Sequence, residues 1–427
     1  MIIRAFQSSR PRRGRATDRR GAALFAIVMS TALIVSLLAL AALNVMRIER
    51  SSALRGQDAA DARRYAQAAI EIGLQRINDD PNWRTTFTSG IWERNRPIGD
   101  GTYTLEGIDR VDGVLATPDT DAVVLIGTGR KGSATQKFQV TLVKDTRGLS
   151  SLKVAMHAGG GLFFSSGTVN CNQIVSSNTN VSNSAATVNS DVQAVNTITG
   201  VYNGTTTPGI TPRQMPDASV FDPYIAKGTA VSYASLPAEL TYRKLEDVVL
   251  SPASNPYGAT NPDGIYVINC KGREIRVRNC RIVGTLVLLN TAPGSRIHRH
   301  VNWEPAVSNY PALLVKGSIK LRCDGHDLDE GKRGVNFNPK GTPYSGTTDT
   351  DIIDTYPNTI TGLIYASGVV TIARAPTITG ALVIGDHLHH WGNLTLNYRS
   401  IYRNNAPPGF RSGDMRVSPG SWRKITD

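Results

Sequence analysis

Two acidic segments carry the residue types most suited to chemistry, and they lie at 324–330 and 349–354. Paired carboxylates could cleave polysaccharides, and carboxylate oxygens are ligands that calcium prefers. Neither segment matches the spaced Asp-x-Asp-x-Asp-Gly calcium loop, and acids beside Gly, Thr and Lys are typical of solvated turns. We therefore expect no catalytic residue, no metal and no cofactor here. The acids are Asp324, Asp327, Asp329, Glu330, Asp349, Asp351 and Asp354.

Histidines give a similarly weak signal. Alternation along a strand places His387 and His389 on one face, and it does the same for His298 and His300. Two imidazoles without a third ligand do not make a zinc site, so we interpret these histidines as surface residues. The sequence also contains neither a phosphate-binding P-loop nor a Gly-x-Ser-x-Gly nucleophile elbow. The motifs therefore favour a protein that is not an enzyme.

The four cysteines are too few for a disulfide framework in a chain of 427 residues. Cys270 and Cys280 each follow an asparagine, and outside the cytoplasm this pair could form a disulfide. A sequence gives no distance between the two Cα atoms, so it does not decide whether the disulfide can form. The alternative is that both cysteines are small buried thiols.

An uncharged N-terminal segment indicates where the chain resides. Residues 21–46 hold no charge and follow a leader, residues 1–21, with seven Arg and one Asp. As a helix the segment would be about 39 Å long, against a hydrocarbon core of about 30 Å. The Arg excess keeps the leader cytoplasmic, so we expect a single-pass protein of the cytoplasmic membrane whose C-terminal bulk is extracytoplasmic. A secretory signal peptide, a plain anchor and a prepilin-type leader remain alternatives, although signal peptides have shorter apolar regions of about 7–15 residues.

The helix is expected to continue beyond the membrane, over residues 22–80. This range contains no proline, and small and apolar residues recur at helical spacing among charged ones after Met46. Pro81 should end the helix, because proline lacks an amide donor and disfavours helical geometry in the preceding residue. The pattern predicts one helix of about 80 Å, half in the membrane and half packed on a globular head.

The N-terminal residues Arg19, Arg20, Gly21 and Ala22, with the long apolar half-helix, resemble the start of a type IV pilin-like protein. The resemblance is to PilX-type minor pilins and to the K-type pseudopilin of type II secretion. It implies cleavage after Gly21 by a prepilin peptidase, a mature chain beginning at Ala22, and other pilin-like subunits and assembly-platform proteins as partners.

One position departs from the major-pilin pattern. Ala26 would be the fifth mature residue, where most pilins carry Glu. The lack of a Glu at this position resembles the K-type pseudopilin, which in that family sits at a filament tip. The alternative is a tethered protein that never enters a filament.

Residues 81–148 are expected to form a small antiparallel head. Period-two patterns predict strands at 102–106, 122–129 and 135–143, with a hairpin loop at 129–133.

Residues 149–400 are expected to form a parallel β-helix, or solenoid. The stretch 359–365 recurs 18 positions later at 377–383, which suits one turn of a solenoid, and 282–287 and 198–202 echo it. The fold class is therefore α+β followed by all-β, with a β-sandwich as the alternative. A Pro-rich excursion at 207–262 should cover a flank or end of the solenoid, and residues 401–427 should form an irregular tail.

Charge gives only a weak indication of partners. Removing residues 1–21 lowers the net charge from +13 to +7, which favours contact with polysaccharide or another anionic surface and no specific nucleic acid. The basic run 271–278 is interpreted as the solvent face of a strand.

Two functional classes are consistent with these observations. The first is a non-enzymatic pilin-like component of a type IV pilus or a type II secretion-like system, whose β-helix serves display or adhesion. The second is a surface-tethered β-helix carbohydrate-active enzyme, a lyase or hydrolase. A concave groove with converging carboxylates would favour the enzyme.

Overall fold

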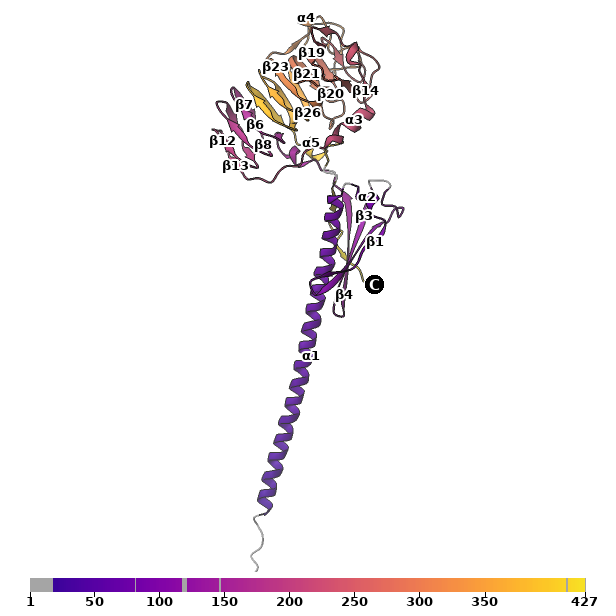
Figure 1. The fold of residues 1–427 in the computed structure, drawn as a ribbon, viewed down its shortest axis with the longest axis vertical. Coiled ribbons are helices and arrows are strands. Elements are labelled where there is room, and N and C mark those ends of the chain that lie inside the picture. The colour runs from indigo at the N-terminus through magenta and orange to yellow at the C-terminus, as the bar shows by residue number, and fades with distance from the viewer. Residues whose placement is uncertain (1–17, 81, 117–120, 146, 412–413, 427) are drawn as a thin grey trace, which may run out of the picture. The chain divides into compact units, whose positions relative to one another are not determined.

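The computed structural model describes residues 18–426 apart from 81, 117–120, 146 and 412–413 (Figure 1). Most of the expected leader, residues 1–17, lies outside the described residues. The chain divides into two compact units. The first runs to residue 144 and resumes at 414, and the second comprises 145–413.

The first unit begins with the helix α1, Asp18–Asp79. It starts four residues before the expected boundary and ends at the acidic residues that precede position 81. Its C-terminal half lies along the strands of the head, whereas the apolar N-terminal half is exposed (Figure 1). A short helix α2, Trp83–Thr86, follows.

The head is an antiparallel sheet in the order β1-β2-β3-β4-β31, and β32 also pairs with β4. The three predicted strands are present as β2–β4, and the hairpin between β3 and β4 turns at Gly132, whose φ of 54° favours glycine. The sequence did not predict β1, because its charged residues and Pro97 do not resemble a strand pattern. The bounds are β1 Gly90–Ile98, β2 Gly101–Asp109, β3 Val123–Lys131, β4 Ala134–Lys144, β31 Met415–Val417 and β32 Arg423–Lys424.

Two glycines of β3 allow α1 to approach the sheet closely. A Cβ atom on Gly129 would lie 2.0 Å from the carbonyl oxygen of Ala62, and one on Gly127 would lie 2.1 Å from that of Ala66. Alanines on the helix and glycines on the strand therefore bring the two backbones together. The core between them is otherwise apolar, with members Ile70, Ile77, Leu105, Leu125, Val140 and Leu142.

Ion pairs fix the same packing at its polar edges. Lys131 Nζ of β3 donates to Asp61 Oδ2 of α1 at 2.7 Å, and this hydrogen bond lowers the pKa of Asp61. Arg76 lies 2.6 Å from Glu93 of β1, and the Tyr103 hydroxyl donates to the same carboxylate. Helix and sheet are thus joined by charged contacts as well as by apolar ones.

The second unit is a solenoid whose strands form one 24-stranded sheet, parallel throughout except for the β15–β16 pair. The strands of its first part are β5 Met156–Ala158, β6 Leu162–Phe164, β7 Thr168–Cys171, β8 Val175–Ser177, β9 Val181–Asn183, β10 Thr187–Asn189, β11 Val192–Ala194, β12 Ile198–Thr199 and β13 Thr206–Pro208.

The second part begins with β14 Thr229–Ala230, β15 Ala238–Glu239, β16 Tyr242–Glu246, β17 Val249–Leu250, β18 Ile265–Asn269, β19 Ile275–Val283, β20 Thr285–Thr291, β21 Arg296–Glu304, β22 Leu313–Gly317 and β23 Ile319–Cys323. It ends with β26 Thr359–Ala366, β27 Val370–Ile372, β28 Thr377–Ile384, β29 Leu388–His390 and β30 Leu394–Tyr398.

The chain joins this stack of coils at its middle. The coil β5–β7 pairs on one side with β8–β10 and on the other with β28–β30. From β5 the chain therefore builds coils to one end at β13. It then crosses to the opposite end at β14 and returns through β18–β30.

The 18-residue repeat confirms the solenoid register. Ile360 pairs with Ile378 and Thr361 pairs with Thr379 on adjacent coils, while Leu382 lies further along the same strand. Ile360, Ile378 and Leu382 are fully buried in one core. Burying a side chain of this size contributes about 1.5–3 kcal/mol, so each coil is stabilised chiefly by its neighbours. The inward column continues as Leu250, Ile282, Trp303, Ile360, Ile378 and Leu396. The stretch 198–202, which was expected to repeat the same pattern, does not belong to this column, because Ile198 pairs with Val181 in a different one.

Part of the Pro-rich range 207–262 covers a flank of the solenoid. Its helices η2, Ala218–Phe221, and α3, Asp222–Lys227, place apolar side chains on the outer face of β18, β20, β22, β26 and β28. Phe221 lies 5.8 Å from Tyr365 between ring centroids. The rest of the range adds β14–β17, which complete the end of the stack.

The expectation of an irregular tail over residues 401–427 is wrong, because this range contributes elements to both units. Its first part contains α5, Ile401–Asn404, and the buried Phe410, which belong to the solenoid unit. Its last part adds β31 and β32 to the head sheet. These strands have three and two residues, so they are too short for a period-two pattern to be recognised.

Candidate functional site

The N-terminal half of α1 is an exposed apolar surface. The helical range Ala23–Asp79 contains the one stretch of the described chain that is long and apolar enough to cross a membrane. Its apolar side chains contact no other part of the described structure, since Leu24, Phe25 and Leu33 are all more than 60% exposed. An apolar stripe of this length needs a lipid or protein environment.

The residues of the predicted prepilin-type processing site lie within this helix. Arg19, Arg20, Gly21 and Ala22 belong to the first turns of α1, and their side chains fall outside the described part of the structure. Ala26 is exposed, and its carbonyl accepts a hydrogen bond from Ser30 Oγ at 2.8 Å. The structure leaves the processing site a prediction.

The acidic segments at 324–330 and 349–354 stabilise an insertion between β23 and β26. Glu330, fully buried, accepts hydrogen bonds from the backbone N–H of Phe337 at 2.5 Å and from the Tyr356 hydroxyl at 2.8 Å. It also accepts one from Asp354 N at 3.1 Å. Asp349 accepts from the Asn338 amide at 2.9 Å. Glu330 and Asp349 thus hold loops of the insertion together. Burial and the nearby charges of Asp349 and Glu330 raise the pKa of Asp354. The insertion contains β24 Leu328–Asp329, α4 Glu330–Arg333 and β25 Thr355–Tyr356.

A buried arginine anchors the same insertion. Arg281 of β19 is fully buried and donates to the carbonyl oxygens of Thr342 at 2.8 Å and Pro343 at 2.7 Å. Burial lowers the pKa of Arg281, and the nearby Glu304 opposes this shift. Backbone carbonyl oxygens thus satisfy the buried guanidinium group, so Arg281 serves to hold the insertion in place.

The histidines do not form a metal site among the described residues. His387 and His389 lie on one face as expected, and both contact the ring of Phe163. His387 Nδ1 accepts from Gly161 N at 2.6 Å, so this nitrogen is already occupied. His390 points into the core, where burial lowers its pKa to about 4. His390, which follows His389 in the strand, is thus a core residue rather than a surface one, because alternation turns it inward.

The candidate disulfide between Cys270 and Cys280 is not formed in the structure. All four cysteines are free, and these two are fully buried in the solenoid core. Cys270 follows β18 and Cys280 lies within β19, so they occupy two different sides of one coil. Burial raises the pKa of Cys270 to about 12, which makes it an unreactive apolar group.

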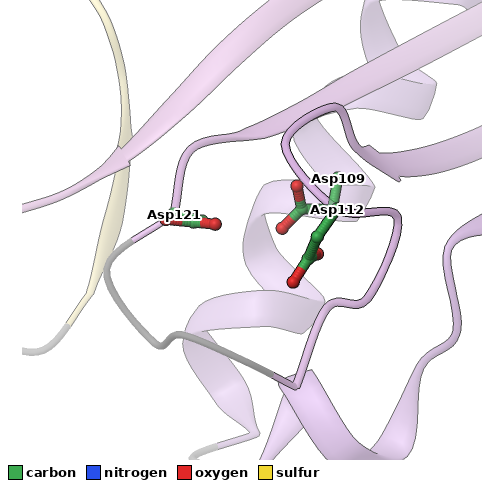
Figure 2. Close-up of side chains that lie close together, drawn as sticks. All are labelled: Asp109, Asp112 and Asp121. Carbon is green, nitrogen blue, oxygen red and sulfur yellow. The ribbon is translucent and has the colours of Figure 1, made fainter.

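Three acids of the head gather in a loop that the sequence did not single out. Figure 2 shows Asp109, Asp112 and Asp121, whose nearest carboxylate oxygens lie within 4.8 Å of one another. Asp109 Oδ1 accepts from Val111 N at 2.7 Å, and Asp112 Oδ1 accepts from Val114 N at 2.8 Å. These are Asx turns, in which aspartate shapes its own loop. The turns use one carboxylate oxygen of Asp109 and one of Asp112, whereas Asp109 Oδ2 and Asp121 Oδ2 are buried and have no hydrogen-bond partner among the described residues.

A basic surface on the solenoid is the most distinctive chemical feature of the second unit. Basic residues of β19, β21 and β23 stand in register on consecutive coils and alternate with buried apolar ones; they are partly exposed except for Arg278, which is buried. We call this set the basic ladder. One column is Arg276, Arg296 and Lys320, and the column beside it is Arg278, His298 and Arg322.

The two ends of the basic ladder differ in their partners. At the β19 end, Arg278 pairs with Glu239 at 2.7 Å and with Glu246, and Arg276 lies over the ring of Tyr242. At the β23 end, no ion pair or side-chain hydrogen bond to Arg296, Lys320 or Arg322 is found within the described chain.

Uncompensated charge is evident around this end. Burial, together with the charges of Arg276 and Arg322, lowers the pKa of Arg296, and the charge of Glu274 opposes this shift in part. Burial and four surrounding arginines lower the pKa of His298 to about 3, so it is neutral near pH 7. Like charges about 5 Å apart repel by about 1 kcal/mol in water and by more near a protein surface. This repulsion is a cost that a bound anion would relieve.

No protein-family model and no curated protein sequence matches the chain. Among solved structures, it is similar to the competence-associated pilin ComZ from Thermus thermophilus, with 12% identity and a TM-score of 0.33, over 86% of this chain and 98% of that one. It is also similar to an ice-binding protein from an Antarctic biological consortium, with 12% identity and a TM-score of 0.24, over 57% of this chain and 87% of that one. A third similarity is to an ice-binding protein from the Antarctic ascomycete Antarctomyces psychrotrophicus, with 12% identity and a TM-score of 0.22, over 59% and 100% of the two chains.

Proposed function

We propose that the chain is a membrane-inserted pilin-like component of a type IV pilus or a type II secretion-like system. The observation that carries this proposal is the division of α1. Its first half is an exposed apolar stripe, and its second half packs on a small antiparallel sheet. A helix built in this way can lie in the membrane or against other subunits while it carries a folded head.

The solenoid would serve as a display or adhesion surface. In the sequence it is inserted between β4 and β31, which are paired strands of the head sheet. In this proposal the C-terminal bulk is extracytoplasmic, and the partners are other pilin-like subunits and assembly-platform proteins. The leader resembles those of PilX-type minor pilins and the K-type pseudopilin, which supports assignment to these classes.

We further propose that the solenoid is not an enzyme. The carboxylates that raised the enzymatic alternative make structural hydrogen bonds, as Glu330 does with Phe337 and Tyr356. A hollow beside Tyr233, with a volume of about 470 Å³, is lined by Lys271, Arg273 and mostly apolar residues, without a carboxylate. These features support binding rather than hydrolysis.

The proposal is tested by the N-terminus of the mature protein. The intact mass of membrane-extracted protein should correspond to a chain beginning at Ala22 when a prepilin peptidase is present, and to the uncleaved chain when it is absent. Gly21→Leu is the matched variant, and it should remain uncleaved in both conditions. A mature chain beginning near Ala42 would indicate a secreted protein instead.

A further inference from the structure

We infer that the unpaired end of the basic ladder, Arg296, Lys320 and Arg322, binds a linear polyuronate, an acidic polysaccharide with one carboxylate on each sugar. The inference rests on the proposed display function and gives the chemistry of its partner. The bound chain would run along the solenoid axis, across β21, β23 and the strands of the next coils.

Charge complementarity favours an acidic partner. Arg296 of β21 and Lys320 and Arg322 of β23 come from two adjacent coils, and no ion pair to them is found in the described structure; the charge of Glu274 acts on Arg296 only from beyond ion-pair distance. Arg278, at the other end, is neutralised by two glutamates. Guanidinium groups bind carboxylates with two parallel hydrogen bonds, and a lysine ammonium adds a compact charge. The carboxylates of a bound polyuronate would neutralise these cations, as Glu239 and Glu246 neutralise Arg278.

The spacing of the cations favours a linear polymer. Neighbouring strands lie about 4.7–4.9 Å apart, so cations on consecutive coils repeat at this interval along a straight line. A sugar unit advances an extended polyuronate by a similar length. Arg296 and Lys320 can therefore meet the carboxylates of neighbouring sugars, while Arg322 lies beside Lys320 on the same strand.

The residues beyond the cations in the same column favour a sugar chain. After Lys320 the register continues through Thr371, His389, Phe163 and Ser182. The imidazole of His389 and the hydroxyl of Ser182 are partly exposed and can form hydrogen bonds with the hydroxyls of a polysaccharide. Thr371 is buried, so the polar groups that the column offers beyond the cations are those of His389 and Ser182.

Nucleic acid fits this surface less well. Proteins that bind single strands offer open aromatic faces on which bases stack. Here the rings of Phe163 and His389 stack on each other, with centroids 5.2 Å apart and planes within 16° of parallel, so each covers a face of the other. Trp391, beside His389, is an exposed ring at this surface, but stacking of successive bases would need a series of such rings.

The test measures binding of the full-length chain, in detergent micelles, to polygalacturonate. The variant replaces the three cations as Arg296→Gln, Lys320→Gln and Arg322→Gln. A control with the same change in net charge replaces three exposed lysines elsewhere on the unit, as Lys153→Gln, Lys316→Gln and Lys340→Gln. We expect the ladder variant to lose affinity by about tenfold or more with a shallower salt dependence, and the control to change by less than about twofold.

Three outcomes would overturn the inference. They are absence of polygalacturonate binding by the unmodified chain, equal losses in the ladder and control variants, and tighter binding to oligothymidylate than to polygalacturonate. The last would identify a nucleic acid as the partner. If the ladder variant fails to fold, Arg296→Lys with Arg322→Lys takes its place. This variant keeps the charge and should retain binding but lose part of the affinity that bidentate pairing supplies.

The inference and the proposed function can fail separately. Correct cleavage after Gly21 without polyuronate binding would refute only the ladder inference. Polyuronate binding by a chain that is never cleaved at Gly21 would refute only the pilin-like function.

Discussion

Replacing Ile378 with aspartate should nearly abolish the folding of the solenoid. Ile378 is fully buried between Ile360 and Leu396 on the neighbouring coils. Removing the side chain from the core forfeits about 2–3 kcal/mol of burial. The new carboxyl must also become neutral, and protonating a group with a pKa of about 3.9 at pH 7 costs about 4 kcal/mol. The total of about 6–7 kcal/mol is comparable to the whole stability of a typical domain, about 5–15 kcal/mol.

The matched control is Thr379→Asp, one residue along the same strand. Thr379 is partly exposed on the outer side, so its replacement should change stability by less than about 1 kcal/mol. Urea unfolding followed by circular dichroism would measure both variants, with Ile378→Val as an intermediate case expected to cost about 0.5–1.5 kcal/mol. Equal destabilisation at positions 378 and 379 would refute the inward and outward assignment.

Three further predictions concern the head, the pH response and the filament. Gly129→Val should destabilise the head by about 3 kcal/mol, because the valine side chain would collide with the backbone of α1. Gly56→Ala should not destabilise it, because a Cβ atom at Gly56 meets open space. Thermal unfolding would compare the two variants. Burial lowers the pKa of His157 to about 3 and that of His390 to about 4. Between these pKa values and pH 6.5, the two imidazoles are therefore protonated in the unfolded chain and neutral in the folded one. Stability should therefore fall as the pH drops below 6.5, by about 2 kcal/mol for each histidine at pH 5, and His157→Gln should flatten the dependence of the melting temperature on pH. If Ala26 leaves a neighbouring subunit's terminal amine unpaired in the membrane at a cost of several kcal/mol, immunogold labelling should mark filament ends, and uniform labelling of shafts would contradict this.

Periodicity explains which features could be predicted from the sequence. The long helix was indicated by apolar spacing without proline, and the pairing of Ile360 with Ile378 by two copies of a repeat that are 18 residues apart. Both signals are local, and each depends on one repeated pattern that neighbouring residues support.

The basic ladder could be predicted only in part. The interpretation of 271–278 as the solvent face of a strand holds only in part. The strand begins at Ile275, Arg276 is partly exposed, and Arg278 is buried against Glu239 and Glu246. The alignment of Arg276 with Arg296 and Lys320 could not be foreseen, because these coils differ in length and an insertion separates Lys320 from the next coil. Register between irregular coils depends on tertiary packing, which no local pattern reports.

The position at which the chain joins the solenoid could not be predicted either, and it has a structural consequence. A solenoid that the chain builds from one end to the other has termini at opposite ends of the stack. Here the chain joins at a central coil, and its two ends meet, since Gly148 N donates to Arg403 O at 2.8 Å and Leu149 N donates to Phe410 O at 2.9 Å.

In the head, Lys144 and Met415 are also direct partners across β4 and β31. Ends that meet in both units allow a large domain to be inserted between two adjacent strands without opening the sheet. The middle of the inserted chain then forms both ends of the stack, β13 on one side and β14–β17 on the other. We infer that this arrangement lets a small helix-and-sheet head carry a solenoid much larger than itself, because coils could be added or lost at either end without disturbing the paired strands that hold the insertion.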